Sequence, residues 1–585
     1  MKRLALAVFA TVSVLLVASG PVVARPLEPV LKTPTATGTG GAAATVDLLG
    51  TRAAIDVLRA GGNAVDAAVA AAAVLGVVEP FSCGIGGGGF MTIYRAKDRS
   101  VHTIDHREAA PATMRPDSFF ANGAVLPFND ARYSGLSVGV PGTVRGWQEA
   151  LRRFGTKPLG TLLVPAIRAA AGGFEVDQTF ADQTTANVPW FDDITSTRAL
   201  YLDPDGTAPD VGTTFRNPDL ARTYATLALF GPDAFYRGPI ADAMVRAVAA
   251  PPVAAGADHV WRPGLLAPGD LRAYRAIERA PTRSDYRGLS IYSMGPPSSG
   301  GSTVGEALNI LDALPSASWH EYLEASRYAF ADRNAYVADP AYFDVPLRGL
   351  LSDGFAATRA ALVTDRAATS PVAPGDPYPF EGRVAPGPAA AAPTASPVGS
   401  STTHLTVADK WGNVVSYTFT IESTGGSGIV VPGYGFLLNN ELTDFNIDST
   451  THPNRADGGK RPRSSMSPTI VLRGGKPVLA LGSPGGATII TTVAQILFDW
   501  YGLGTPLPAA LAAPRFSQRN AASTAVEPAA LTLPFAADLI ARGHRLTPGA
   551  EIGAATAIEF GPRGQLTAVA EPVRRGGGSA AVVRR

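Results

Sequence analysis

Thr402 stands at an abrupt change in the chain and is the strongest candidate nucleophile. Residues 369–401 are rich in Pro, Ala, Gly and Ser and offer little to bury, which predicts a mobile loop. A strand-like alternation begins directly after Ser401. Cleavage between Ser401 and Thr402 would give one residue both a hydroxyl and a free α-amino group, a combination that can activate a weak nucleophile. The boundary therefore predicts a cleavage site whose product is a catalyst.

The residues after Thr402 predict a β-hairpin that places a second hydroxyl beside it. Two strand-like runs, 402–409 and 413–422, flank a three-residue connection that ends in Gly412, and this fits a type I turn followed by a bulge. The resulting register pairs Thr402 with Thr420, with roughly 5 Å between their Cβ atoms. An ordinary exposed hairpin also alternates, and a slip of one residue would destroy the pairing. One face of the second strand is polar along its length, with Ser416, Thr418, Thr420 and Glu422.

The composition describes a globular protein with a large core. Of its 585 residues, 46% are hydrophobic and 17% are charged. The net charge of +1 argues against partners such as nucleic acid or anionic lipid, which a strongly basic chain would attract. Cys83 is the only cysteine, so an internal disulfide and a multi-cysteine metal site are excluded, and the thiol is expected to be buried and inert.

The start of the chain has the layout of a secretory signal. A basic pair at Lys2-Arg3 precedes an apolar run over residues 4–18, and small residues at Val22 and Ala24 suit cleavage after Ala24. The apolar run is short for a bilayer span, although an uncleaved anchor is the alternative interpretation. Residues 1–24 are therefore predicted to be a signal peptide, and the mature protein to be exported, periplasmic or secreted, without a stable membrane anchor.

The rest of the chain predicts a mixture of helices and strands. Helices are expected within the Ala-rich segment 45–80, interrupted at Gly61-Gly62-Asn63, and a hairpin is expected around 90–104. Further helical periodicity recurs at 143–153, 160–172, 218–229, 239–249, 303–336, 487–502 and 534–542. The segment at 369–401 is the clearest boundary, and it divides residues 25–401 from residues 402–585.

Motifs along almost all of the mature chain resemble the γ-glutamyltransferase family. They are GGNAVDAAVA (61–70), GIGGGGF (84–90), DHREAAP (105–111), GVPGT (139–143), ADRNAYVADP (331–340), TTHLTVAD (402–409), GFLLNNELTDF (435–445), RPRSSMSPTIV (461–471), GSPGGA (482–487) and the closing RRGGG. The resemblance implies an α+β fold, the αββα sandwich of the N-terminal nucleophile hydrolases. It also implies one precursor that cleaves itself into a large subunit, 25–401, and a small catalytic subunit, 402–585, which stay associated.

The resemblance assigns the catalytic groups. Thr402 matches the nucleophile of both self-cleavage and catalysis, and its own amine would act as the general base once cleavage has freed it. Thr420 matches the residue whose hydroxyl supports the nucleophile, in agreement with the hairpin register. Gly485 and Gly486 match the oxyanion hole, where glycine lets backbone N–H groups approach the reacting carbonyl.

The resemblance also assigns the pocket for a γ-glutamyl group, which carries a carboxylate and an ammonium. Arg107 matches the carboxylate clamp, and its planar guanidinium suits two parallel hydrogen bonds. Ser464 and Ser465 match a hydroxyl pair that assists it. Glu441 and Asp444 match the acidic residues that hold the ammonium, so opposite charges are expected to be held apart. The implied partners are glutathione-like γ-glutamyl donors and amino-acid or peptide acceptors, and no cofactor is implied.

Two positions depart from the family pattern. Glu422 stands where well-known members often have an asparagine that contacts the amino end of the substrate, and a third carboxylate would raise the pKa values of its neighbours. Only fifteen residues separate Asp444 from Lys460, fewer than in relatives with a lid loop over the pocket. A shorter cover would favour hydrolysis or polymeric substrates because the acyl-enzyme is more open to water and large acceptors.

Other signals carry less weight. Ser137 has the spacing of a nucleophile elbow, but Pro141-Gly142 follows where a helix should start. The glycine-rich loop at 84–89 lacks phosphate-binding context and is expected to pack tightly, and His102 and His106 have the wrong period for a metal site. Rival functions are an acylase for glutaryl or β-lactam side chains, a depolymerase of capsule poly-γ-glutamate, and an inactive exported binding protein.

Overall fold

The computed structural model describes residues 32–385, 387 and 401–584. The predicted signal peptide and residues 388–400 lie outside the described residues. From Thr33 onward, the described residues form one compact unit. Within the described residues, no helix combines the length and the apolar character that a membrane crossing requires.

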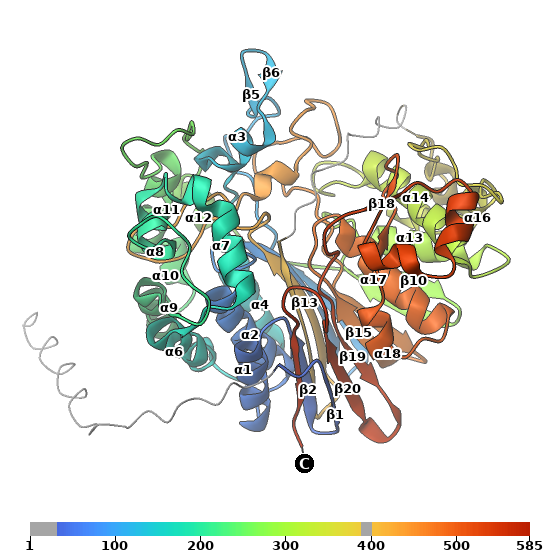
Figure 1. Cartoon of the computed structure of the whole chain (residues 1–585), viewed down its shortest axis with the longest axis horizontal. Coiled ribbons are helices and arrows are strands. Elements are labelled where there is room, and N and C mark those ends of the chain that lie inside the picture. The colour runs from blue at the N-terminus through green and yellow to red at the C-terminus, as the bar shows by residue number, and fades with distance from the viewer. Residues whose placement is uncertain (1–31, 386, 388–400, 585) are drawn as a thin grey trace, which may run out of the picture. The chain divides into compact units, whose positions relative to one another are not determined.

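Two seven-stranded antiparallel sheets form the centre of this unit (Figure 1). In spatial order the first sheet contains β21 (Ser579–Val582), β2 (Gly41–Thr45), β12 (Thr403–Asp409), β13 (Val414–Thr420), β3 (Gly88–Arg95), β4 (Ser100–Asp105) and β9 (Ile277–Arg279). The second contains β1 (Thr35–Gly38), β20 (Leu566–Ala570), β19 (Thr556–Phe560), β15 (Lys476–Gly482), β14 (Thr469–Arg473), β11 (Leu289–Ser293) and β10 (Thr282–Tyr286).

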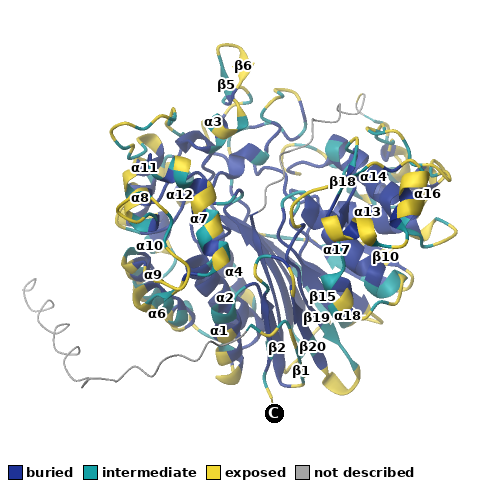
Figure 2. Ribbon diagram, viewed as in Figure 1, coloured by how far each residue is buried: buried dark blue, intermediate teal, exposed yellow. Residues whose placement is uncertain are grey.

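The two sheets face each other across a layer of mainly apolar side chains. Strands of the first sheet contribute small residues such as Ala42, Ala44 and Ala408, and strands of the second contribute Ala480 and Ala568. Every strand of the predicted hairpin is buried on both faces, as the dark strands of Figure 2 show. The alternation of residue types along these strands therefore does not mark a solvent-exposed face. Each sheet has the other sheet on one side and helices on the other.

Helices cover the outer faces of both sheets. The first sheet packs against α1 (Leu48–Arg59), α2 (Ala64–Val78), α4 (Thr143–Phe154), α6 (Val164–Gly172), α9 (Pro218–Phe230) and α11 (Pro239–Ala249). The second packs against α13 (Gly300–Asp312), α14 (Trp319–Tyr336) and α17 (Thr488–Leu497). The predicted αββα sandwich is thus confirmed, and Figure 1 shows the two helical layers on opposite sides of the sheets.

The remaining strands and α-helices complete the fold. The short strands are β5 (Phe120–Ala121), β6 (Ala124–Val125), β7 (Phe174–Glu175), β8 (Thr214–Phe215), β16 (Phe516–Ser517), β17 (Thr524–Val526) and β18 (Leu546–Pro548). The remaining helices are α3 (Phe128–Arg132), α5 (Leu159–Leu162), α7 (Gln178–Phe191), α8 (Thr195–Tyr201), α10 (Asp233–Tyr236), α12 (Pro268–Ala273), α15 (Leu347–Leu350), α16 (Asp353–Ala360), α18 (Leu507–Ala512) and α19 (Ala536–Ala541).

The predicted break at Gly61-Gly62-Asn63 is confirmed and has a clear local cause. Asn63 accepts hydrogen bonds from the N–H groups of Val65 and Asp66, and Asp66 accepts one from the N–H of Asn63. This reciprocal cap starts α2. All fifteen residues of α2 are buried, so its Ala-rich sequence reflects a helix enclosed on every side.

Two sequence predictions need correction. The single helical stretch expected at 303–336 is two helices, since Pro315 cannot continue α13 and Ser318 caps the start of α14. The first half of the predicted mobile loop is packed against the fold, which overturns that prediction for residues 369–385. The N–H of Val372 donates to Asn520 and that of Gly375 donates to Asp332. Local composition could not show these distant partners.

Strands from the two sides of the predicted cleavage site pair with each other in both sheets. β12 pairs with β2, and β13 pairs with β3. In the second sheet β20 pairs with β1, and β14 pairs with β11. Because these ladders connect the two halves of the chain, cutting one peptide bond before Thr402 would leave the halves joined by both sheets.

Candidate active site

The predicted hairpin register places the two threonine hydroxyls together. His404 lies opposite Thr418 in the β12–β13 ladder, and continuing this register pairs Thr402 with Thr420. The Thr402 Oγ1 atom is 3.0 Å from Thr420 Oγ1, within hydrogen-bond distance. Both strands are buried in the middle of a sheet, so the exposed-hairpin alternative is excluded.

The backbone at Thr402 is strained. Its φ angle is +88°, in the left-handed region that β-branched residues rarely adopt. A residue held there costs about 1–3 kcal/mol and persists only where its surroundings enforce it. The neighbours do so: the Ser401 hydroxyl donates to the carbonyl of Phe81 (2.9 Å), and Arg575 donates to the carbonyl of Thr402 (2.8 Å). The Ser401–Thr402 peptide is therefore clamped on both sides.

The carbonyl that the Thr402 hydroxyl would attack is already bound by a backbone donor. The Gly485 N–H donates to the Ser401 carbonyl oxygen at 3.2 Å. A donor at this oxygen stabilises the negative charge that develops when a nucleophile adds to the carbonyl carbon. Gly485 has φ +133°, and a Cβ atom there would lie 2.6 Å from Thr488 Oγ1, so glycine is required at this position.

The glycine-rich loop at 84–89 packs closely against the backbone of β13, the strand that carries Thr420. A Cβ atom at Gly87 would lie 1.9 Å from the Thr420 carbonyl oxygen, and one at Gly89 would lie 2.5 Å from the Thr418 carbonyl oxygen. Side chains here would push β3 away from β13. The predicted tight packing of this loop is confirmed.

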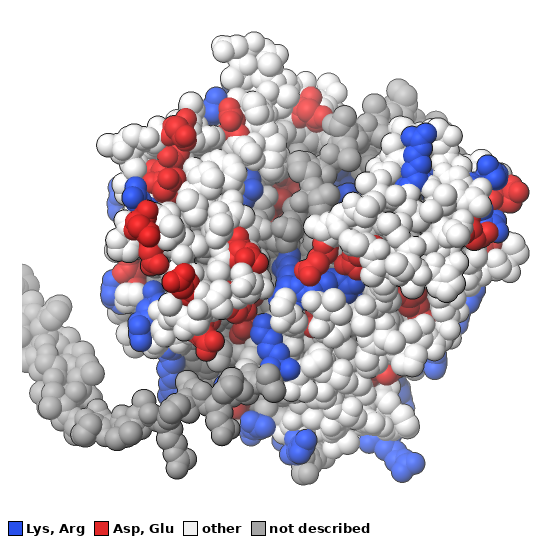
Figure 3. All heavy atoms as spheres, in the orientation of Figure 1, with Lys and Arg blue, Asp and Glu red and all other residues white. Residues whose placement is uncertain are grey.

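Thr402 and Thr420 open into a pocket that contains most of the predicted site residues. Figure 3 shows basic and acidic side chains gathered beside each other near the middle of the face viewed in Figure 1. The pocket is lined by Arg107, Arg333, Thr402, Thr420, Glu422, Glu441, Asp444, Arg463, Ser464, Ser465, Met466, Gly486, Ala487 and Ile489. Gly485 is not in this lining, and it reaches the site through its N–H group.

Arg107 does not stand apart from the acidic residues, which corrects the expectation of separated charges. Its guanidinium forms ion pairs with both Glu441 and Asp444 and also donates to the carbonyls of Pro462 and Arg463. Arg107 and Glu441 are almost completely buried, whereas the Asp444 side chain is 34% exposed towards solvent. Arg107 therefore offsets part of the negative charge of Glu441 and Asp444 within the pocket.

The carboxylates crowd one another, as the extra carboxylate at Glu422 predicted. Burial and the nearby Asp444 raise the pKa of Glu422 to about 7, although Ser423 and Asn440 donate hydrogen bonds to it. Burial also raises the pKa of Glu441 well above its usual range; Arg107 opposes this, and the neighbouring carboxylates add to it. Glu108, which is fully buried beside them, has a pKa raised to about 7 by burial.

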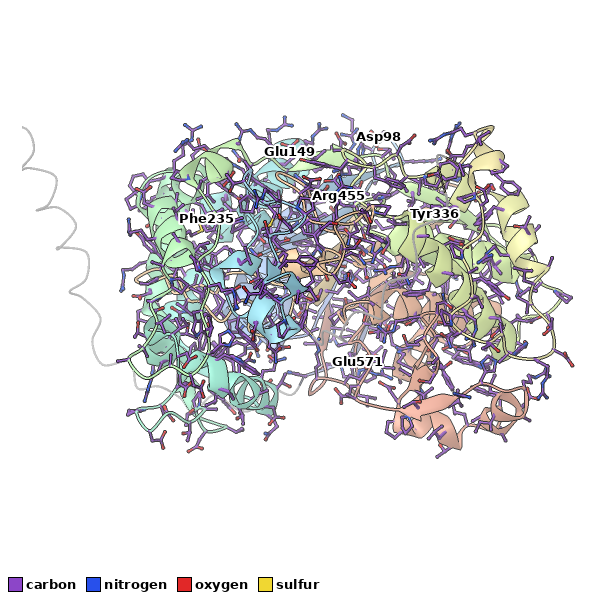
Figure 4. The ribbon with its side chains drawn as sticks, turned by 90° about the horizontal axis from the view of Figure 1, so that it is seen from above. Asp98, Glu149, Phe235, Tyr336, Arg455 and Glu571 are labelled. Atoms are coloured by element: carbon purple, nitrogen blue, oxygen red, sulfur yellow. The ribbon has the colours of Figure 1, made fainter. Side chains whose placement is uncertain are left out.

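The segment that follows Asp444 is short and held down. The N–H of Asn446 donates to the Asn454 carbonyl at 2.8 Å, and the His452 ring bonds to the Asn334 carbonyl at 3.0 Å. Seen from above in Figure 4, Arg455 of this segment lies near the middle of the molecule, with Phe235 on one side and Tyr336 on the other.

Three arginines around this site were not assigned from the sequence. Arg333 and Arg463 line the pocket, and Arg575 binds the Thr402 carbonyl. All three lie inside motifs that carry the family resemblance, ADRNAYVADP, RPRSSMSPTIV and RRGGG. The motifs located them, but a motif does not show which of its residues face the pocket.

The discounted signals have structural explanations. The Ser137 hydroxyl donates to the carbonyls of Arg132 and Ser134 within a tight turn. Cys83 is buried, and burial raises the pKa of its thiol well above the usual value. Among the described residues, no group of three His, Cys, Asp or Glu side chains is placed to hold a metal ion.

Stacked antiparallel sheets between helical layers, with a threonine at the start of a central strand, define the class of N-terminal nucleophile hydrolases. The gamma-glutamyltranspeptidase family profile matches residues 50–581. The chain is 40% identical over 499 residues to the glutathione hydrolase proenzyme of Bacillus subtilis strain 168, covering 83% of this chain and 82% of that protein. The chain belongs to the gamma-glutamyltranspeptidase family and is an enzyme of that family.

Two further comparisons support the family and the fold. The glutathione hydrolase proenzyme of Escherichia coli strain K12 is 35% identical over 557 residues, covering 91% of this chain and 90% of that protein. The crystal structure of cephalosporin acylase from Bacillus halodurans superposes with a TM-score of 0.81 at 29% identity, covering 97% of this chain and all of that chain.

Proposed function

We propose that this chain is a glutathione hydrolase and γ-glutamyltransferase that cuts itself between Ser401 and Thr402 and then uses Thr402 as its nucleophile. The observation that carries this proposal is the arrangement at the scissile peptide. Thr402 is strained, its hydroxyl meets Thr420, and the Ser401 carbonyl is bound by Gly485. Addition of the Thr402 hydroxyl to that carbonyl and loss of the amide nitrogen form an ester, which water then hydrolyses.

The freed amine of Thr402 serves as the general base in the mature enzyme. It takes the proton of the Thr402 hydroxyl as the oxygen adds to the γ-carbonyl of the donor, and the leaving amine departs with a proton. N–H groups of Gly485 and Gly486 stabilise the oxyanion. Water or the amine of an amino acid or peptide then attacks the γ-glutamyl ester and restores Thr402.

The zwitterionic γ-glutamyl group suits a pocket in which Arg107 and Asp444 form an ion pair. The donor α-carboxylate takes the place of Asp444 on Arg107, and the donor ammonium takes the place of Arg107 beside Asp444. The Arg107–Asp444 ion pair is thus exchanged for two ion pairs with the substrate, so neither side chain is left without a partner. Ser464, Ser465, Glu441 and Glu422 complete the polar lining.

An acylase for glutaryl or β-lactam side chains is the second candidate, favoured by the similarity to cephalosporin acylase. A glutaryl group carries the carboxylate but lacks the ammonium. It would leave Asp444 without the cation that it now has in Arg107. The acidic side of the pocket therefore favours γ-glutamyl donors.

Paired donors test this choice. We expect kcat/KM for γ-glutamyl 4-nitroanilide to exceed that for glutaryl 4-nitroanilide by about 10²-fold, because only the first satisfies Asp444. Asp444→Asn should reduce this preference by about tenfold, since a charge-assisted hydrogen bond is lost. Asp448→Asn, an exposed carboxylate in the same segment, is the matched control. A wild-type preference for the glutaryl donor would establish the acylase instead.

Glu422 predicts a pH dependence of donor binding. Its pKa of about 7 means that it is neutral in acid and ionised above pH 7, and only the ionised form attracts the donor ammonium. We expect the inhibition constant of L-glutamate to fall about tenfold between pH 6 and pH 8, as the ion pair forms. In Glu422→Gln the same pH change should have little effect. An identical pH profile in both proteins would remove Glu422 from ammonium binding.

The subunits, the location and the acceptor preference complete the proposal. We expect a large subunit of residues 25–401 and a small subunit of residues 402–585, held together by the shared sheets. Export to the periplasm or medium follows from the predicted signal peptide. The short segment after Asp444 leaves the acyl-enzyme open to water and to large acceptors, which favours hydrolysis or polymeric substrates. The ratio of hydrolysis to transfer at low acceptor concentration tests this, and dominant transfer would contradict it.

A further inference from the structure

Arg333 and Arg463 line the pocket without a carboxylate partner. Neither guanidinium forms an ion pair within the described part of the chain, whereas Arg107 in the same pocket has two. Arg333 is 8% exposed and Arg463 is 5% exposed. A buried guanidinium is normally paired, so two unpaired ones at a pocket wall point to an anion supplied by a ligand.

Arg333 is held rigidly towards Ser465. It lies in the last turn of α14, its Nε donates to Ser299 at 2.8 Å, and one Nη donates to the Ser465 hydroxyl at 2.7 Å. The other Nη donates to the side chain of Asn334, which is uncharged. Arg333 is thus fixed beside one of the serines that line the donor pocket.

Arg463 is held more loosely. Its guanidinium makes only long contacts, 3.4 and 3.5 Å, to the carbonyls of Asn334 and Val337. Most of its hydrogen-bonding capacity is therefore available to a ligand. Arg463 directly precedes the Ser464–Ser465 pair, so both arginines converge on the same wall of the pocket.

The charges at this wall are not balanced. Burial lowers the pKa of Arg333, and the nearby Arg463 and Arg519 lower it further, with Asp444 opposing them. Burial lowers the pKa of Arg463 to about 10. Asp444 is the acidic group that attracts both, but its ion pair is with Arg107. A bound anion would relieve the mutual repulsion of these arginines.

We propose that Arg333 and Arg463 form a second anion subsite, which binds a carboxylate on the leaving group of the donor. This inference rests on the proposed γ-glutamyl transfer. A γ-glutamyl group has one carboxylate, and Arg107 takes it. A second carboxylate must therefore belong to the group attached to the γ-carbonyl, such as the C-terminal carboxylate of a γ-glutamyl peptide.

Two chromogenic donors that differ by one carboxylate test the subsite. The cleaved wild-type enzyme should have a kcat/KM for γ-glutamyl 3-carboxy-4-nitroanilide about tenfold above that for γ-glutamyl 4-nitroanilide, through charge-assisted hydrogen bonds. Arg463→Gln should bring this ratio close to one. Arg463→Lys should restore part of it, because the positive charge returns. Arg473→Gln, an exposed arginine at the end of β14, should keep the wild-type ratio.

Different results would overturn the leaving-group subsite and the proposed function. A wild-type ratio of one or less, or an Arg463→Gln variant with equal losses on both donors, overturns the leaving-group subsite. Hydrolysis of neither donor overturns the proposed function instead. In that case titration calorimetry of wild-type protein with γ-glutamylglycine and γ-glutamylglycinamide decides the subsite separately. Tighter binding of the carboxylate form that Arg463→Gln abolishes supports it, and equal binding refutes it.

Discussion

Replacing Thr402 with alanine will leave the protein as one uncleaved chain without γ-glutamyl transfer. The hydroxyl at Thr402 is the group that meets Thr420 and adjoins the Ser401 carbonyl held by Gly485. Without it neither ester can form, so the loss in kcat/KM should be at least about 10⁴-fold. A denaturing gel should show two fragments for the wild type and one full-length band for Thr402→Ala.

Thr403→Val is the matched control for this experiment. Thr403 is the neighbouring hydroxyl, it is fully buried, and its Oγ1 has no hydrogen-bond partner among the described residues. Valine has nearly the same shape and removes only a hydroxyl without a hydrogen bond among the described residues, so cleavage should proceed. Thr402→Ser should also cleave, because it keeps a hydroxyl. Cleavage at the same bond in Thr402→Ala would show that another group attacks Ser401.

Gly485→Ala should slow self-cleavage by about 10²–10³-fold, the usual cost of losing one oxyanion donor. A Cβ atom at Gly485 would lie 2.6 Å from Thr488 Oγ1, and φ +133° is unfavourable for alanine. The backbone must shift, and this moves the N–H away from the Ser401 carbonyl. The quantity to measure is the half-time of conversion of purified precursor into two fragments.

Gly474→Ala separates backbone strain from loss of the donor. Gly474 also has positive φ, +58°, but nothing lies within 4 Å of a Cβ atom there. It sits in the β14–β15 hairpin, outside the pocket lining. Cleavage by Gly474→Ala should match the wild type. A Gly485→Ala precursor that matures as fast as the wild type would contradict the role given to this N–H group.

The hairpin around the nucleophile could be predicted because its determinants are local. A three-residue turn ending in Gly412 sets the register, and the register alone places Thr420 opposite Thr402. The clamp on the scissile peptide could not be predicted. Gly485 and Arg575 reach Ser401 and Thr402 from distant parts of the chain, and the positive φ of Thr402 results from those contacts.

The ion pairs of the pocket could not be predicted from the sequence either. Family motifs identified Arg107, Glu441 and Asp444, but they did not show that Arg107 forms ion pairs with both carboxylates. Residue type is encoded locally, whereas the partner of a buried charge depends on how distant segments pack. Arg333 and Arg463 were overlooked for this reason, since their importance comes from the partners they lack.

The fold shows where local patterns fail. The helical pattern over 303–336 is interrupted near Pro315, which cannot continue α13, and α14 begins after its N-cap residue Ser318. The Pro- and Ala-rich composition of residues 369–385 suggested a loop without contacts, yet Tyr378 is 2% exposed. Composition describes what a segment can bury by itself and not which neighbours it meets.

The most direct test is to trap the acyl-enzyme and locate it. Purified mature protein is mixed briefly with a γ-glutamyl donor, quenched in acid and examined by intact-mass and peptide mass spectrometry. The proposed mechanism predicts a small subunit that begins at Thr402 and gains the mass of one γ-glutamyl group on that residue. A different N-terminus, or a γ-glutamyl group on another residue during normal turnover, would contradict it.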